Sequence, residues 1–284
     1  MKKLLALALV AIIAIGCLAG CGSSAKVKVI EIDLTSEEYA FGVDKTQPEL
    51  LTEVNDFIKK IKEDGTFDEI LNKYFGDGTP TPVTSAALDE SKDQLVVATN
   101  AAFEPFEYMD GENYLGIDME IAALLAEELG LELVISNMDF DSVCLSVGQQ
   151  KCDIAMAGLT VNEARKEYVT FSDSYYNAAQ RLVVMADDTT FDACTDAASV
   201  EAILNTYTLE DETVTKIGVQ NGTTGQFYVQ GDADWGFAGF GVECVGYKNG
   251  SLAVQDMING NIKYVIIDSA PAKCITDEIG RAHV

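Results

Sequence analysis

From Leu95 onward, short apolar runs alternate with segments of amphipathic helical periodicity. This alternation is typical of βα units arranged around parallel sheets. The first set of predicted strands is 95–99, 131–135, 153–157 and 181–185. After the polar, turn-rich stretch 187–196, a second set has strands near 216–219, 242–247 and 263–267. Its helices are expected after Thr223, Gly250 and Asp268. The pattern therefore predicts two α/β lobes, with ligands bound at the C-terminal ends of strands.

The segment 117–129 shows the helical pattern most clearly. Apolar side chains fall on one face of the expected helix: Ile117, Ile121, Ala122, Leu124 and Leu125. Glu127 and Glu128 fall on the opposite face, and Gly130 follows as a natural helix stop.

The first part of the chain has a different organisation. A strand is expected near 27–32 and a short one near 39–43, with helices that begin near Pro48 and Thr66. The stretch 77–94 contains Gly78, two prolines and several Ser and Thr residues, a composition typical of a linker.

The charge balance restricts the possible partners. The chain of 284 residues has 46 acidic and 19 basic side chains, with a formal net charge of −27. Such a field repels phosphates, so nucleic-acid binding is excluded. The apolar fraction of 48% argues against intrinsic disorder. The single histidine, His283, argues against His-based catalysis and multi-histidine metal sites, and we expect no cofactor and no metal.

The N-terminus has the pattern of a bacterial export signal. Two lysines precede the apolar run 4–15, which is too short to cross a bilayer. The run ends in Leu-Ala-Gly-Cys, which resembles the lipoprotein cleavage box with Cys21 as the acylated residue. We expect residues 1–20 to be removed and the protein to lie outside the cytoplasm, anchored by lipid to the cell membrane. The alternative is an ordinary secretory signal in which Cys21 is unmodified.

The other cysteines show no metal-binding or disulfide spacing. Once Cys17 leaves with the signal and Cys21 is lipidated, five remain: Cys144, Cys152, Cys194, Cys244 and Cys274. We expect small buried side chains. A bridge between Cys194 and Cys244 stays open.

Six segments, in order, point to a family. They are VATNAAFEPFEY at 97–108, GIDMEIA at 116–122, AGLT at 157–160 with Arg165 five residues on, TFS at 170–172, GVQNGTTG at 218–225 and VIID at 265–268. The chain resembles the family 3 solute-binding proteins of polar amino-acid ABC importers. The resemblance implies a two-lobed, type II periplasmic-binding-protein fold, in which each lobe is a mainly parallel sheet flanked by helices.

The order of the segments departs from the family. The part similar to 34–43, with two helices that end at Tyr74 and Phe75, closes the chain in the family but comes first here. This order resembles a circular permutation. The alternative is that 26–75 is the remnant of an upstream copy. The expected division is a lobe-two edge strand at 26–34, lobe one at 35–76 and 95–184, a linker at 77–94, lobe two at 185–278 and a non-native tail at 279–284.

A free amino acid carries one carboxylate and one ammonium group, and burying either unpaired is costly. The resemblance implies that Arg165 binds the carboxylate, helped by Gly158, Thr160, Thr223 and Thr224. The alternative for Arg165 is a solvated charge beside Lys166 and Glu167. Asp268 is the expected ammonium partner. Its alternative role is an N-cap for the helix that follows, and both roles are compatible.

The side-chain pocket is expected at Phe103 and Phe140, whose alternative role is that of ordinary core aromatics. Asn100 is a neutral amide where relatives with cationic ligands often have an acid, which favours a neutral or polar amino acid. Glu107, Asp139 and Asp141 lie nearby in sequence and are alternative sources of negative charge.

The expected mechanism is capture of a free L-amino acid by lobe closure, with hinges near 34–40 and 183–186, and delivery to an ABC permease. We expect a monomer and no enzymatic activity. The alternative is a dehydratase-type enzyme on the same scaffold, with Glu104 or Glu107 as the acid.

Overall fold

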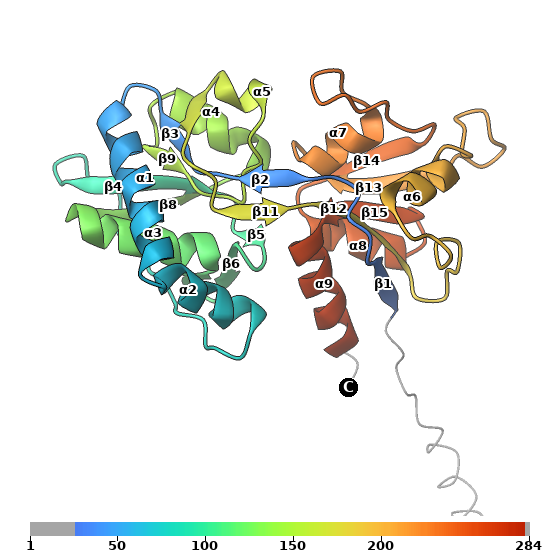
Figure 1. The fold of residues 1–284 in the computed structure, drawn as a ribbon, viewed down its shortest axis with the longest axis horizontal. Coiled ribbons are helices and arrows are strands. Elements are labelled where there is room, and N and C mark those ends of the chain that lie inside the picture. The colour runs from blue at the N-terminus through green and yellow to red at the C-terminus, as the bar shows by residue number, and fades with distance from the viewer. Residues whose placement is uncertain (1–25, 282–284) are drawn as a thin grey trace, which may run out of the picture.

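The computed structural model describes residues 26–281. Two α/β lobes lie side by side, joined by a pair of crossing strands (Figure 1). This is the predicted fold class. The predicted signal peptide, Cys21 and residues 282–284 lie outside the described residues.

Lobe one contains a five-stranded sheet with the order β10-β3-β9-β4-β8. β4 (Gln94–Thr99) runs parallel to β8 (Glu132–Asn137) and β9 (Ile154–Ala155). β3 (Gly42–Asp44) pairs antiparallel with β9 and with β10 (Val169–Phe171). A small second sheet is formed by β5 (Ala102–Phe103), β6 (Glu107–Asp110) and β7 (Asn113–Leu115). The helical segments of the lobe are α1 (Pro48–Glu63), α2 (Thr66–Phe75), α3 (Ile117–Leu129), η1 (Phe140–Ser142), α4 (Val143–Gly148) and α5 (Glu163–Lys166).

Lobe two contains a sheet with the order β1-β12-β15-β13-β14. β13 (Lys216–Gln220) runs parallel to β14 (Glu243–Tyr247) and β15 (Tyr264–Asp268). β12 (Gln180–Met185) pairs antiparallel with β15 and with β1 (Val27–Ile30), which lies at the edge. The helices are α6 (Ala197–Leu204), α7 (Thr224–Gln230), α8 (Gly250–Ile258) and α9 (Ser269–Arg281). α6 was not predicted, and α9 continues into the segment expected as a non-native tail.

The crossing strands are β2 (Glu37–Tyr39) and β11 (Tyr176–Ala178), which pair antiparallel between the lobes (Figure 1). The first lies within the expected hinge 34–40. The second hinge was predicted too late in the chain, because Val183 and Val184 are fully buried within β12 of lobe two. For the same reason, residues 180–184 belong to the lobe-two sheet and not to lobe one. The expected strand 39–43 is divided between β2 and β3 as the chain turns into lobe one.

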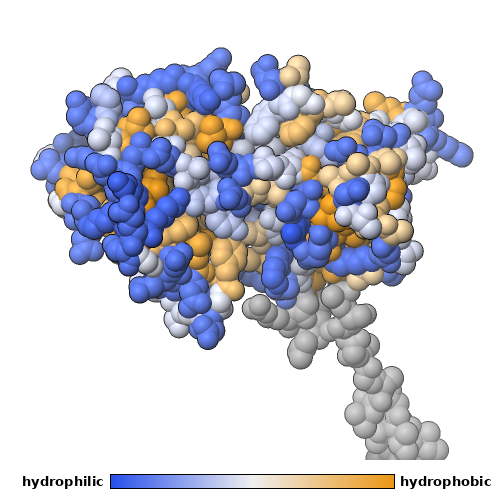
Figure 2. Space-filling view, viewed as in Figure 1, coloured by the Kyte–Doolittle hydropathy of each residue, from blue (hydrophilic) through white to orange (hydrophobic). Residues whose placement is uncertain are grey.

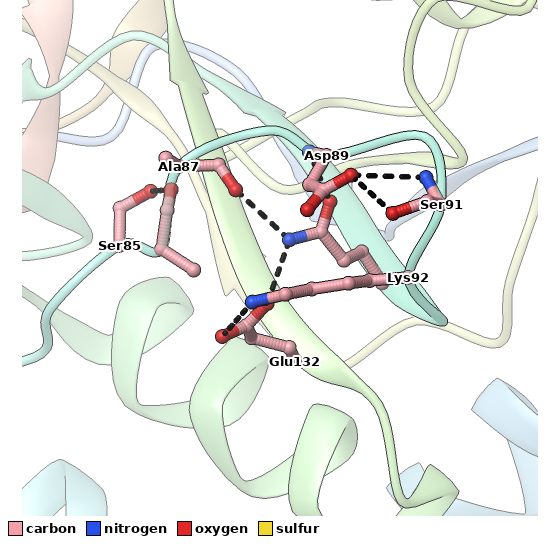
Figure 3. A network of polar contacts seen from close by, with 8 residues as sticks. Ser85, Ala87, Asp89, Ser91, Lys92 and Glu132 are labelled. Atoms are coloured by element: carbon pink, nitrogen blue, oxygen red, sulfur yellow. Dashed lines mark hydrogen bonds and ion pairs between the residues drawn. The ribbon is translucent and has the colours of Figure 1, made fainter.

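Residues 77–93, here called the strap, were expected to be a linker and are packed on lobe one. Val83 and Tyr114 exchange backbone hydrogen bonds of 2.8 and 2.9 Å, and the Ala86 amide donates to the Leu133 carbonyl at 2.9 Å. Farther along, Lys92 pairs with Glu132 at 3.0 Å, and the Asp89 carboxylate accepts from the Ser91 hydroxyl at 2.7 Å (Figure 3). The strap therefore adds contacts to lobe one in addition to joining α2 to β4.

The helix α3 has the bounds that its sequence pattern predicted. It ends at Gly130, whose φ of 68° is left-handed backbone that favours glycine. Hydrophilic side chains cover much of the face of lobe one that carries α1 and α2 (Figure 2). In residues 26–281, no helix combines the length and the apolar character needed to span a bilayer. All five cysteines of this part are free thiols, so Cys194 and Cys244 do not form a bridge; Cys144 and Cys152 are buried and the other three are partly buried.

Candidate ligand-binding site

Arg165 lies in α5, where the carboxamide of Asn162 caps the helix by accepting from the Arg165 amide at 2.7 Å. The side chain is buried, with 9% exposed. Its guanidinium donates to the Thr160 carbonyl at 2.6 Å and stacks over the Phe140 ring at 5.1 Å. Arg165 is therefore not the solvated charge that its charged neighbours suggested. Among the residues that the structure describes, no carboxylate lies within ion-pair distance of it.

The same guanidinium reaches lobe two. It donates to the Gly222 carbonyl at 3.1 Å, across the gap between the lobes. Gly222 has a φ of 74°, and a Cβ there would lie 3.3 Å from the Asp141 side chain. A glycine thus permits both the turn after β13 and its close approach to lobe one.

The two threonines that follow Gly222 begin α7. The Thr223 hydroxyl donates to the Gln220 carbonyl at 2.8 Å, which fixes the turn. The Thr224 hydroxyl is buried and has no hydrogen-bond partner among the described residues. Its polar group is therefore available at the lobe-two side of the site.

Asp268 ends β15 with only 4% of its surface exposed. It accepts a hydrogen bond from the Tyr39 hydroxyl, which comes from the crossing strand β2. Burial, followed by the nearby charge of Glu37, raises the pKa of Asp268 to about 7. The helix after Asp268 begins with Ser269, whose amide donates to the Ala179 carbonyl at 2.8 Å.

Glu37, which the sequence analysis did not single out, lies beside Asp268. One carboxylate oxygen accepts from the Thr35 hydroxyl at 2.5 Å and from the Gln180 amide at 3.1 Å, and the other accepts from the Thr160 hydroxyl at 2.7 Å. The only local signal was the alternation in β2, where Glu37 and Tyr39 share the buried face. Nothing in that pattern indicated that a buried acid faced another buried acid.

Thr160 connects the two charged ends. Its carbonyl accepts from Arg165, and its hydroxyl donates to Glu37, which lies next to Asp268. The residues expected to hold a carboxylate and an ammonium group are therefore connected through Thr160 and Glu37, although Arg165 and Asp268 are far apart in the chain.

Asn100 follows the end of β4 and also connects the lobes. Its amide nitrogen donates to the Met138 carbonyl at 2.7 Å, and its oxygen accepts from the Gln220 amide at 3.2 Å. The oxygen of Gln220 is buried without a hydrogen-bond partner among the described residues. Two neutral amides thus meet at this end of the site.

Phe103 is buried beside Gly158. A Cβ on Gly158 would lie 2.9 Å from the Phe103 ring, and the φ of 53° is again left-handed backbone. The ring also lies 6.0 Å from that of Phe106. Between the lobes, next to Phe103, is an open pocket of about 400 Å³ that Asn249 and Pro271 line from lobe two.

The acids singled out from the sequence as sources of negative charge are placed differently from one another: Glu107 is buried, whereas Asp139 and Asp141 are exposed. The pocket itself is lined by other acids, Glu104, Asp110 and Glu278. Glu107 is fully buried, and burial followed by the charges of Asp118 and Asp268 raises its pKa well above the ordinary value. Its protonated form is therefore favoured. Asp139 pairs with Lys248 at 3.2 Å. In the part of the chain that the structure describes, no group of three His, Cys, Asp or Glu residues has the arrangement of a metal site.

Comparison with known proteins identifies relatives of this chain. The family described as bacterial extracellular solute-binding proteins, family 3, matches residues 10–77 and 95–272. The arginine-binding extracellular protein ArtP of Bacillus subtilis is 35% identical over 37% of this chain. The arginine-binding periplasmic protein of Mannheimia haemolytica is 27% identical over 62% of it. The chain spans 41% and 63% of the lengths of these two relatives.

Solved structures show the same fold. The arginine-binding protein of T. maritima in its holo form has 32% identity and a TM-score of 0.53, over 68% of this chain and 77% of its own. An ancestral arginine-binding protein bound to glutamine has 30% identity and a TM-score of 0.54, over 68% and 76%. An ancestral amino-acid-binding protein, a precursor of cyclohexadienyl dehydratase, has 26% identity and a TM-score of 0.54, over 75% and 78%.

Proposed function

Because the chain belongs to the family 3 bacterial extracellular solute-binding proteins, we propose that it captures a free L-amino acid between its lobes and delivers it to an ABC permease. The observation that carries this proposal is the link through Thr160 between the buried Arg165 and the buried Glu37, which lies beside Asp268. A zwitterion has the matching pair of charges. The relatives named above are binding proteins by name, which favours binding over catalysis.

The roles of the residues follow from their charges. Arg165 binds the ligand carboxylate with two charge-assisted hydrogen bonds, supported by Gly158, Thr160, Thr223 and Thr224. Asp268 binds the α-ammonium. Phe103 and Phe140 enclose the ligand side chain.

For the ligand, we propose a neutral or polar amino acid. The support is the pair of amides, Asn100 and Gln220, whose groups match a side chain with both a donor and an acceptor. The named relatives of known ligand mostly bind arginine, which makes a cationic ligand the rival. The ancestral protein with bound glutamine supports the neutral class within the same fold.

Closure supplies the mechanism. The lobes rotate about β2 and β11, so that Gly222 and Gln220 approach or leave the residues of lobe one that they contact. The closed, ligand-bound protein is the form that docks on the permease. Cys21 carries the lipid that keeps the monomeric protein at the outer face of the membrane.

The order of the segments is proposed to reflect a circular permutation. In support, the family matches this chain in two parts separated by the strap, and β1 pairs with β12 beside α9 (Figure 1). Moving residues 26–76 behind α9 should yield a chain that folds and binds the same ligand. If 26–75 is a remnant of another copy, deleting it leaves lobe one and lobe two folded, and the permutation is rejected.

The decisive experiment is a thermal-shift screen with the twenty amino acids. A ligand that binds only the folded state raises the melting temperature, and the rise grows with the logarithm of ligand concentration over Kd. The proposal predicts stabilisation by one or a few amino acids, with glutamine above arginine. If none stabilises the protein, the proposed function is rejected.

A dehydratase-type activity is the second candidate, because one structural neighbour is a precursor of such an enzyme. Incubation of the selected amino acid with the protein, followed by mass spectrometry, separates the two. Unchanged ligand supports transport, and loss of water from it supports the enzyme.

A further inference from the structure

The acidic end of the site contains more negative charge than one ammonium group requires. Glu37 and Asp268 each have 4% of their surface exposed. Among residues 26–281, neither carboxylate lies within ion-pair distance of a lysine or arginine. Two buried carboxylates with no cation cannot both keep their charge at low cost.

The backbone brings these two side chains together. Gln180 and Asp268 are directly opposite in the pairing of β12 with β15, and the Gln180 amide donates to Glu37. Tyr39, two residues after Glu37 on the same face of β2, donates to Asp268. Asp268 is thus held by a residue of β2, the strand that carries Glu37. Glu37 is held by a residue of β12, the strand that pairs with β15, which carries Asp268.

We propose that Glu37 is a second ammonium-binding carboxylate, which holds the ligand's α-ammonium jointly with Asp268. The inference rests on the proposed function, because it assumes an amino-acid ligand. Its chemistry is a proton exchange: the ligand arrives as a protonated amine, its N–H groups donate to both carboxylates, and the proton that Asp268 holds in the free protein leaves to the solvent.

Other groups near the pair do not replace that role. Tyr39 donates from β2, and burial keeps the pKa of its hydroxyl well above the ordinary value, so it remains neutral. Glu107 interacts with Asp268 from β6, and burial, followed by the charge of Asp118, favours its neutral form by raising its pKa. Arg165 makes its hydrogen bond to the Thr160 carbonyl and approaches Glu37 only through that residue.

The proposal predicts the direction of a pH effect. Burial and the charge of Glu37 raise the pKa of Asp268 to about 7. Below that pH the free protein holds the proton that the ligand must displace, so affinity rises as the pH increases from 5.5 to 8.

Titration calorimetry with L-glutamine tests this in the unaltered protein. At pH 6, measurements in two buffers of different ionisation enthalpy should show release of close to one proton per bound ligand, and at pH 8.5 close to none. Binding without proton release at pH 6 would overturn the inference. If the screen selects arginine, L-arginine is the probe.

The variant Glu37→Gln separates ammonium recognition from general damage. L-Glutamine should bind about tenfold to a hundredfold more weakly. The affinity for glutaramate, the analogue without the α-amino group, should change less than about twofold. Proton release at pH 6 should be smaller, because the charge of Glu37 no longer raises the pKa of Asp268 and only burial does. The matched control is Glu38→Gln, an exposed neighbour on β2, which should behave as the unaltered protein.

The outcomes distinguish this inference from the proposed function. If no amino acid binds the unaltered protein, the proposed function itself fails. If L-glutamine binds and Glu37→Gln keeps its affinity, or loses affinity equally for glutaramate, only the role of Glu37 is rejected. If Glu37→Gln does not fold, the proton count of the unaltered protein decides.

Discussion

Arg165 and Asp268 are both buried, but the groups around them differ in kind. Arg165 is held by two backbone carbonyls and an aromatic ring, none of which gains or loses a proton. Asp268 lies among a tyrosine, a glutamine and a second carboxylate. The cationic end therefore has a fixed charge, whereas the charge of the acidic end depends on pH and on the ligand. Replacing residues at the two ends should have effects of different form.

The largest effect is expected at the cationic end. Arg165→Ala should weaken amino-acid binding by a factor of about 100 or more, because two charge-assisted hydrogen bonds are lost together. Affinity for glutaramate should fall equally, since the carboxylate is common to both. Calorimetry measures both losses.

Lys166→Ala is the matched control for this experiment. Its side chain is half-exposed and pairs with Glu163 at 2.7 Å, so its removal should leave binding and melting temperature nearly unchanged. An Arg165→Ala protein that melts normally and still binds would mean that the carboxylate is held elsewhere.

At the acidic end, Asp268→Asn should lower the affinity for amino acids by about tenfold to a hundredfold. The affinity for glutaramate should fall much less. The amide keeps the shape but does not pair with an ammonium charge. Asp277→Asn, an exposed position on α9 that pairs with Lys273, provides the control. An equal loss of affinity for both ligands would show that Asp268 does not bind the ammonium group. The two ends of the site would then not differ as described.

A smaller effect is expected where the amides meet. Asn100→Asp adds a negative charge beside Gln220 and loses the donor to the Met138 carbonyl. The ratio of arginine to glutamine affinity should rise about tenfold, because one neutral hydrogen bond to the ligand side chain is replaced by a charge-assisted one. Asn205→Asp adds the same charge at an exposed helix end as a control. An unchanged ratio would show that Asn100 does not face the ligand side chain.

The smallest effect concerns stability. Burial raises the pKa values of Asp118 and Asp268 to about 7, from 3.8. Between these pH values the folded state keeps a proton that the unfolded state releases, so the stabilisation is complete below pH 4 and is lost as the pH rises through 7. The melting temperature of the free protein should therefore fall by about 5 °C or more from pH 5 to pH 8.

Asp118→Asn tests the origin of this slope. The Gly158 amide and the Tyr175 hydroxyl donate to different oxygens of Asp118, at 2.9 and 2.7 Å. The asparagine oxygen can still accept from the Gly158 amide, while its NH2 group can donate to the Tyr175 hydroxyl. The variant should show a shallower decline than the unaltered protein. An equal slope would assign the pH dependence to the overall negative charge instead.

Local chemistry determined much of this protein from its sequence. The helix 117–129 and its stop at Gly130 follow from periodicity and from a backbone conformation that glycine adopts readily. Most strands of the βα pattern lie where their apolar runs predicted them. Arg165 was selected because its five-residue distance from Thr160 resembled the family, and its side chain is indeed bonded to Thr160.

Other features needed the tertiary structure. The second crossing strand, β11, has little apolar character, so its role depends on pairing with β2, which lies far earlier in the chain. The strap has the composition of a linker, but its hydrogen bonds come from β7 and β8. Glu37 and Asp268 are separated by more than two hundred residues, and no local sequence pattern indicates that they lie close together in space. Sequence periodicity encodes which face of an element is buried, whereas the partner that meets a buried charge is decided only when distant strands pair.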